Sequence, residues 1–245
     1  MRVYRSFSWK ETNLRVASPA FELITRAVVE QRRLLERYIA RHPEFQSSLV
    51  PVVLLEQAPE VARRMAVASE LTGVGPMAAV AGTLAQMGAE AAIAEGCPEA
   101  IVENGGDIYI HAASEVTIGI YAGDNAIAGK LAFRLEPHRL PLALCSSSSK
   151  MGHSLSFGRC DLATVVAKDA ALADAAVTLV CNRIKAAADL TPVLDEVGAI
   201  PGIAGIFAVH SGKVGMWGDL PPLVRNEDGE ARRKITRDLH SDFQG

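Results

Sequence analysis

The sequence predicts an α+β protein in which mainly antiparallel sheets pack with helices. Its strand-like runs are short, and they are separated by breaks rich in glycine, aspartate or serine, as in antiparallel sheets. Other segments carry apolar residues at helical spacing between clear start and stop signals. The chain has 245 residues, of which 49% are hydrophobic and 22% charged, so it can bury a large core as one domain or two fused lobes.

The first elements are expected to be a hairpin followed by helices. Two short strands flank Lys10-Glu11-Thr12, and Ser18-Pro19 then opens a helix, with Ser18 as its N-cap, that ends near His42 before Pro43. In order, we predict strands over 3–9 and 13–16 and helices over 18–42, 59–73 and 76–95. The last helix is apolar nearly all round and rich in small residues, so it should lie at the centre of the fold.

The remaining elements are mostly strands. We predict strands over 100–103, 107–112, 116–121, 131–135, 142–145 and 163–167, a helix over 169–187, and a hairpin formed by 203–210 and 214–217. Beyond Pro221-Pro222 the chain becomes charged and poorly periodic, so we expect a loosely packed tail.

Charge and composition limit the classes of function. The formal net charge of −3 and the pI near 6.1 provide no overall basic field for nucleic acid. Arg32, Arg33, Arg37 and Arg41 cluster locally, and we interpret them as the solvated face of a helix. No segment reaches the roughly 18 uninterrupted apolar residues of a membrane span, and the N-terminus lacks the apolar region of a signal peptide. We therefore expect a cytoplasmic protein.

The cysteines do not form a recognisable metal or redox motif. Cys97, Cys145, Cys160 and Cys181 are widely spaced and include no Cys-x-x-Cys pair, which argues against a zinc knuckle or a thioredoxin-type site. In a reducing cytosol we expect them to be free thiols in or near the core.

The first candidate site is Asn104-Gly105-Gly106-Asp107, which lies between two apolar runs. One interpretation is a hairpin turn, because Asn-Gly between alternating apolar residues is a strong hairpin pattern. The other is a ligand site, in which the glycines let a ligand approach the backbone closely and the flanking polar groups bind it. A tight turn would also present the glycine amides and Asp107 to a ligand, so the two interpretations are compatible.

The second candidate is the pair Asp174 and Thr178 within a predicted helix. A spacing of four places both on one face of a helix whose other residues are almost all alanine, valine and leucine. A carboxylate and a hydroxyl on an apolar helix are candidate ligands for a divalent cation such as Mg²⁺. Alternatively, Asp174 is a surface residue and Thr178 bonds back to the helix carbonyls.

The third candidate is the polar run after the strand that ends at Cys145. Ser146, Ser147, Ser148 and Ser149 are followed by Lys150 and His153, and together these residues could bind a phosphate group. Two alternatives remain. Cys145 or a serine could be a nucleophile with His153 as its base, or the run could be an exposed loop.

The order of these motifs resembles the ApbE family of FAD:protein FMN transferases. Gly105, Gly106 and Asp107 match its Gly-Gly-Asp turn, the Ser146 to Ser149 run its Ser-Gly segment, His153 its histidine, and Asp174 with Thr178 its magnesium ligands. The similarity covers roughly residues 76–178. It implies one ApbE-like domain of two-lobed architecture over 1–245, with an N-terminal hairpin and helix over 1–58, a core over 59–218 and a charged tail over 219–245.

Two departures from that family affect the implied chemistry. Ala81-Gly82 replaces a Lys-Gly pair in the central helix, and Ser156-Phe157-Gly158 stands where the family has Asp-Pro-x-Thr-Gly. The chain is also similar to a divergent prokaryotic branch that begins with a Lys-Glu-Thr-Asn-Leu-like hairpin, here Lys10 to Leu14.

The resemblance implies binding of FAD, or of another phosphate-containing ligand, together with Mg²⁺. If the chain is an enzyme, the implied reaction is Mg-dependent transfer of FMN from FAD to a target protein, with His153 orienting or deprotonating the nucleophile. The alternatives are a binding module without turnover and a different metal-dependent enzyme on the same scaffold. The apolar composition is compatible with a homodimer.

Overall fold

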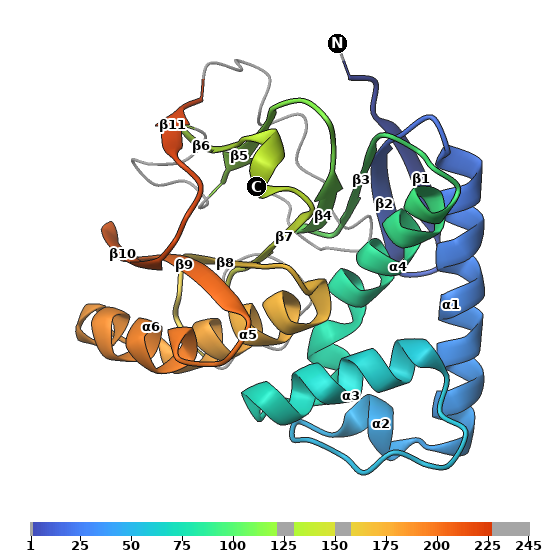
Figure 1. Ribbon diagram of the computed structural model, residues 1–245. Helices are drawn as coiled ribbons and strands as arrows, with labels where there is room; N and C mark the ends of the chain where they lie inside the picture. Colours follow the sequence, from blue (N-terminus) through green and yellow to red (C-terminus); the bar gives the residue numbers. More distant parts are fainter. Residues whose placement is uncertain (1, 122–129, 150–157, 227–245) are drawn as a thin grey trace.

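A computed structural model describes residues 2–121, 130–149 and 158–226 of the chain. Its main feature is a large antiparallel sheet with helices on one face and a small sheet on the other (Figure 1). This arrangement confirms the predicted α+β class.

The large sheet has eight strands in the order β1-β2-β3-β4-β7-β8-β9-β10, and every neighbouring pair is antiparallel. Their bounds are Arg5–Trp9, Thr12–Ala17, Ala100–Asn104, Asp107–His111, Leu142–Ser147, Leu162–Ala167, Ile203–His210 and Lys213–Gly218. The small sheet has the order β11-β6-β5, with bounds Leu223–Arg225, Leu131–Leu135 and Val116–Ile120. The predicted hairpins at the two ends of the chain therefore form the two edges of one sheet.

The helices gather on one side of the large sheet (Figure 1). The α-helices α1 to α6 have bounds Phe21–Arg41, Glu44–Ser47, Glu60–Thr72, Val80–Ala94, Ala170–Arg183 and Leu190–Gly198. Short 3-10 turns occur at Pro76–Ala79, Pro137–Arg139 and Ala187–Asp189. Helix α4 packs against α1, α5, β3 and β4, which confirms its predicted central position.

Two hydrophobic clusters divide the core according to the faces of the large sheet. The larger cluster joins the helices to strand residues such as Val102, Tyr109 and Cys145. The smaller cluster consists almost entirely of strand residues, and Phe133 of β6 meets Phe207 of β9 in an edge-to-face contact with ring centroids 5.9 Å apart. Because strand residues alternate between faces, the inner strands of the large sheet contribute to both clusters.

Several boundaries differ from those predicted. Helix α1 begins at Phe21 with Ala20 as N-cap, because Ser18 accepts a hydrogen bond from the Ala20 amide and donates to the Glu99 carbonyl, and so anchors the preceding loop. The predicted helix 76–95 is a 3-10 turn followed by α4, and the predicted helix 169–187 ends at Arg183.

Three elements were missed. These are α2, α6 and β11, and β11 lies in the segment that we expected to be a loosely packed tail. It pairs with β6 through Leu223 to Arg225.

The segment Pro76–Ala94 is long and apolar enough to cross a membrane by length and composition. In this fold it instead contributes Leu84, Ala85 and Ala89 to the main hydrophobic cluster, where each is at most 1% exposed. A core helix of a globular fold commonly has this composition.

Candidate functional site

The Gly105-Gly106 pair forms the turn between β3 and β4. Asn104 pairs with Asp107 across the hairpin, and both glycines have positive φ, +65° and +106°. Two-residue hairpins favour this backbone because it matches the twist of the strands. The hairpin interpretation is therefore confirmed. The residues that flank the glycines are only 6% and 7% exposed, which is unusual for the ends of a surface turn.

Asn104 and Asp107 face the helix side of the sheet, where α4 begins. The side-chain amide of Asn104 donates to the carbonyl of Ala81 at 3.2 Å. The Asp107 carboxylate accepts hydrogen bonds from the Ser146 amide and the Cys145 thiol of the neighbouring strand β7. Its Oδ1 atom is buried and has no hydrogen-bond partner among the described residues. The turn thus fixes one polar group on α4 and leaves one carboxylate oxygen unsatisfied.

Helices α4 and α5 cross directly beside this turn, at Gly82. A Cβ atom on Gly82 would lie 2.3 Å from the Ala170 carbonyl oxygen and 2.9 Å from the Asp174 Cβ, so only glycine allows this approach. The Asp174 carboxylate accepts the Gly82 amide at 2.8 Å and also the Ala81 amide. In return, Gln86 on α4 accepts the Ala170 amide at 2.6 Å. Each helix therefore satisfies free amides at the start of the other.

Two buried carboxyl groups, those of Asp107 and Asp174, dominate the electrostatics of this region. Burial raises the pKa of Asp174 to about 7, against the lowering effect of the Gly82 and Ala81 amides. Burial, and next the negative charge of Asp174, raise the pKa of Asp107 well above its usual value. The pair therefore resists carrying two negative charges unless a cation or additional donors offset them.

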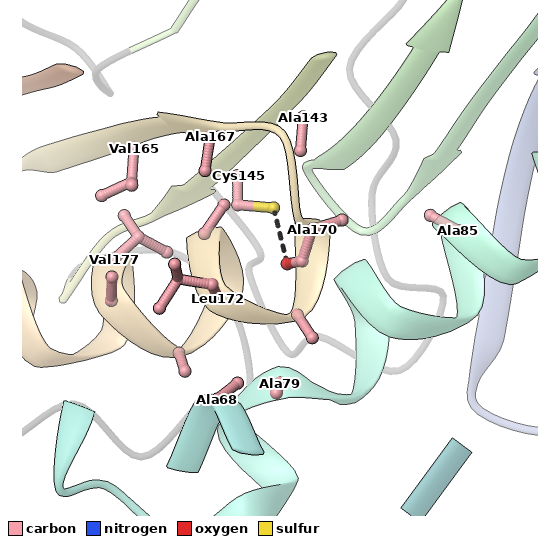
Figure 2. Close-up of a cluster of buried hydrophobic side chains, with 14 of the residues drawn as sticks. Ala68, Ala79, Ala85, Ala143, Cys145, Val165, Ala167, Ala170, Leu172 and Val177 are labelled. Carbon is pink, nitrogen blue, oxygen red and sulfur yellow. Dashed lines mark hydrogen bonds between the residues drawn. The ribbon is translucent and has the colours of Figure 1, made fainter. Parts of the chain in front are cut away.

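Cys145 is a core thiol and not an exposed nucleophile. Its side chain is fully buried, and its Sγ atom lies 3.6 Å from the Ala170 carbonyl oxygen, among Ala143, Val165 and Ala167 (Figure 2). Burial, followed by the charge of Asp107, raises the pKa of this thiol well above its usual value. Since the thiolate is the reactive form, this environment argues against the nucleophile interpretation.

The serine run does not converge on the two carboxyl groups as a unit. Ser146 faces the side of the small sheet and shares a hydrogen bond with Thr164 at 2.9 Å, whereas the Ser147 hydroxyl bonds to the Cys181 thiol. Ser148 is buried, and the Ser149 amide donates to the Cys160 carbonyl. The Ser146 amide is the group of this run that contacts Asp107. His153 and Lys150 lie outside the described residues.

Thr178 lies one turn after Asp174 on α5 and is half-buried. Its spacing from Asp174 agrees with the predicted pair. Within the described ranges, no group of three or more His, Cys, Asp or Glu side chains is arranged to hold a metal ion. The magnesium assignment to Asp174 and Thr178 therefore stays a prediction. The interpretation of Asp174 as a surface residue is wrong, because it is 8% exposed.

Two residues of this arrangement were not identified as functional from the sequence. Gly82 was noted only as part of the replaced Lys-Gly pair, and Gln86 was not singled out. Their spacing of four on an otherwise apolar helix places both on one face, and that spacing could have indicated a helix crossing.

Comparisons with known proteins agree with this fold. The chain is 41% identical over 226 residues to a UPF0280 protein of Methanocaldococcus jannaschii, a match covering 89% of this chain and 91% of that protein. It is 40% identical to a UPF0280 protein of Methanocella arvoryzae over 92% of each chain.

Solved structures of flavin transferases share the fold at low identity. ApbE of Vibrio cholerae is similar with a TM-score of 0.56 and 12% identity, covering 89% of this chain and 96% of that chain. Flavinyl transferase ApbE of Pseudomonas stutzeri gives 0.57 and 10%, covering 96% of each. The family model AbpE_bact, described as "AbpE bacteria", matches residues 5–195. The chain therefore belongs to the AbpE_bact family, a divergent ApbE-like family that has the fold of the flavin transferases.

Proposed function

We propose that the chain binds a phosphate-containing ligand, of which a flavin nucleotide is the best candidate, together with a divalent cation at Asp174. The observation that carries this proposal is the buried Oδ1 of Asp107, which lacks a hydrogen-bond partner among the described residues and belongs to the carboxyl group coupled electrostatically to Asp174. A buried acceptor without a hydrogen-bond partner, next to a second acid, destabilises the fold unless a ligand supplies the missing interaction.

The donor set fits a hard cation. Asp107 and Asp174 supply carboxylate oxygens, and Thr178, one turn after Asp174, supplies a hydroxyl. Mg²⁺ prefers oxygen ligands and is usually bound by one or two carboxylates, with water and phosphate in the remaining positions. When bound, the cation would supply charge neutralisation for a phosphate group. The residues of the chain would hold it between β4 and α5.

The turn and the start of α4 would bind the remainder of the ligand. Among the described residues, no heavy atom lies within 4 Å of the position of a Cβ on Gly105, so a ligand can approach the backbone there. The side-chain amide of Asn104 donates to the Ala81 carbonyl, and the Asp174 carboxylate accepts the backbone amides of Ala81 and Gly82. These contacts fix the backbone of α4 against the turn before a ligand arrives. Ser146 to Ser149 and His153 remain candidates for contacts to phosphate or flavin.

Titration with FAD in the presence and absence of MgCl₂ tests the proposal. We expect FAD to bind with Mg²⁺ present, and we expect Asp174→Asn and Asp107→Asn to weaken binding at least tenfold. Asp195→Asn is the matched control, because Asp195 is an exposed acid on α6. Absence of flavin binding at high micromolar FAD and millimolar Mg²⁺ would contradict the proposal.

A second candidate is that the chain also transfers FMN to a protein, as the names of its structural neighbours suggest. The loss of the family lysine at Ala81 and of the Asp-Pro pair favours binding without turnover. Release of AMP from FAD, measured by chromatography together with a flavin label on protein, distinguishes the two. Bound FAD that remains intact over hours would establish the binding module.

A further inference from the structure

Two of the arginines that were interpreted as a solvated helix face, Arg33 and Arg37, line a groove on α1 together with Arg26. The groove follows the exposed face of α1, with Phe7 of β1 at its border, and has a volume of about 670 Å³. Its lining consists of Phe7, Glu22, Thr25, Arg26, Val29, Glu30, Arg33 and Arg37. It is separate from the Asp107 and Asp174 cluster, which lies between β4, α4 and α5.

The arginines of the groove are free to bind an anion. Arg26, Arg33 and Arg37 are exposed, and none of them forms an ion pair with another described residue; the Arg33 guanidinium lies 5.7 Å from the centre of the Trp9 ring. By contrast, Arg32 on the neighbouring face is ion-paired with Glu11 and Glu36. Spacings of seven and four along α1 place the three arginines on one stripe.

The acids of the groove do not cancel this charge. Glu22 is engaged by Arg5 at 2.8 Å, which leaves Glu30 as the acid opposed to the three arginines. The groove is therefore positively charged on a chain whose net charge is −3. An acidic ligand is the complementary occupant.

Strand β1, which contributes Phe7 to the groove, offers a free edge. β1 is the end strand of the eight-stranded order and pairs with β2 alone within the described chain. The outward backbone groups of such a strand can pair with another extended segment. Phe7 faces the helices, and it supplies an apolar floor together with Val29.

The length of the arginine stripe on α1 agrees with the length of β1. From Arg26 to Arg37 the helix advances about 16 Å, at 1.5 Å per residue. An extended peptide covers the same length in about five residues, and β1 has five residues. In a strand added to β1, alternate side chains would point to the helix side, where the arginines lie.

We propose that this groove binds an extended acidic segment of a partner protein, which adds to β1 as a further strand with alternate carboxylates facing Arg26, Arg33 and Arg37. A single-stranded nucleic acid fits less well, because it has no backbone amide and carbonyl groups that could pair with the free edge of β1. The inference does not depend on flavin chemistry.

Fluorescence anisotropy with a labelled peptide of alternating valine and glutamate tests the proposal on the full-length protein. We expect saturable binding in 50 mM salt that weakens in 500 mM salt, and no binding of the matching valine–lysine peptide. Arg33→Glu with Arg37→Glu should weaken binding at least tenfold. Arg41→Glu with Arg63→Glu changes the total charge equally outside the groove and should change binding less than twofold. Equal weakening by the two double variants would overturn the proposal.

Backbone methylation tests the strand geometry separately. In an added strand, only every second amide of the peptide faces β1. N-methylation of one alternating set of amides should therefore abolish binding, and methylation of the other set should preserve it. Equal binding of the two methylated peptides, or tighter binding of a single-stranded oligonucleotide of equal charge, would overturn the assignment to a peptide strand.

Discussion

Asp174 combines a structural role with a proposed functional one. It caps the start of α4 through the Gly82 amide, and it is also the carboxylate that we propose binds a cation. Its side chain is 8% exposed, so the protein bears the energetic cost of burying an acid. The Asp174 carboxylate accepts two backbone amides, those of Gly82 and Ala81, and these hydrogen bonds offset part of that cost.

The raised pKa of Asp174 predicts a dependence of stability on pH. The folded protein holds this proton up to a pKa of about 7, whereas an aspartate in the unfolded chain releases it near pH 4. Below pH 4 Asp174 is protonated in both the folded and the unfolded state, so its contribution to the free energy of unfolding is fully present. As the pH rises to 7, the unfolded state loses the proton first, so the free energy of unfolding falls, by about 4 kcal/mol at most.

Urea denaturation at pH 4.5 and pH 7.5 measures this effect. We expect Asp174→Asn to lose less stability than the wild type between the two pH values, because the variant has no proton to release. The surface acids contribute equally to the pH dependence of both proteins. Their contribution therefore cancels when the change in unfolding free energy between the two pH values is compared for the variant and the wild type. Asp195→Asn should keep the wild-type difference. An identical pH dependence in Asp174→Asn and the wild type would contradict the raised pKa.

Gly105 gives a second prediction at the scale of one residue. Its φ of +65° disfavours residues with a Cβ, but the described part of the chain leaves space around it. Gly105→Ala should therefore cost about 1 kcal/mol of unfolding free energy through backbone strain alone, and Gly105→Asn should cost less, because asparagine tolerates this region. Thermal denaturation of the two variants provides the measurement. A larger loss for asparagine than for alanine would show that side-chain space, and not φ, limits the turn.

The crossing of α4 and α5 is the element-scale feature that shapes the site. Ala81, at the start of α4, is contacted there by Asn104, which is 23 residues away in sequence. It is also contacted by Asp174 of α5, which is much further along the chain. The crossing is close because Gly82 has no side chain, and it is reinforced by Gln86. The turn and the two helices thus form one connected polar unit within an apolar core.

Gly82→Ala should disrupt this unit. Its Cβ would meet the Ala170 carbonyl oxygen at 2.3 Å, and a backbone atom can move only if the helices separate. We expect a loss of about 2–3 kcal/mol in the free energy of unfolding, the upper part of the range for overpacking. Chemical denaturation provides the value.

Gly88→Ala on the same helix is the matched control. Its Cβ would meet a methyl group of Val28 at 2.7 Å, which is a side-chain contact, and alanine gains about 1 kcal/mol of helix propensity over glycine. The loss should therefore be smaller than for Gly82→Ala. Equal losses would show that the backbone contact to Ala170 does not limit the crossing.

The elements also show what sequence patterns can and cannot predict. The hairpins, α3 and the Gly105-Gly106 turn follow from local residue types, and they were predicted. Helix α6 was missed because Pro192 and Gly198 lie within only nine residues. The three-residue strand β11 has no pattern of its own and depends on the edge of β6. The groups near Asp107 could be named from motifs, but the contacts of Gly82 and Gln86 depend on tertiary packing.

At the scale of the whole molecule, the large sheet separates two kinds of surface. Its helix face holds Asp107, Asp174 and the crossing helices, and its other face binds the small sheet through the smaller hydrophobic cluster (Figure 1). Arg32 illustrates the same separation at the edge. We expected it to face solvent with Arg33, Arg37 and Arg41, but it turns towards β2 and pairs with Glu11. Three-dimensional packing, not helix periodicity alone, decides which charges remain free.

This division predicts that the small sheet can be loosened without loss of the site. Phe133 is 1% exposed and contacts Phe207 across the two sheets, so Phe133→Ala should cost about 3–5 kcal/mol. Phe133→Leu keeps most of the buried volume and should cost less than about 1.5 kcal/mol. Hydrogen exchange should accelerate in β5, β6 and β11 of the alanine variant, while amides of β3, β4 and α4 keep their protection. Uniform acceleration throughout the chain would instead mean that the two faces unfold as one unit, and the Asp107 and Asp174 cluster would then depend on the small sheet for its stability.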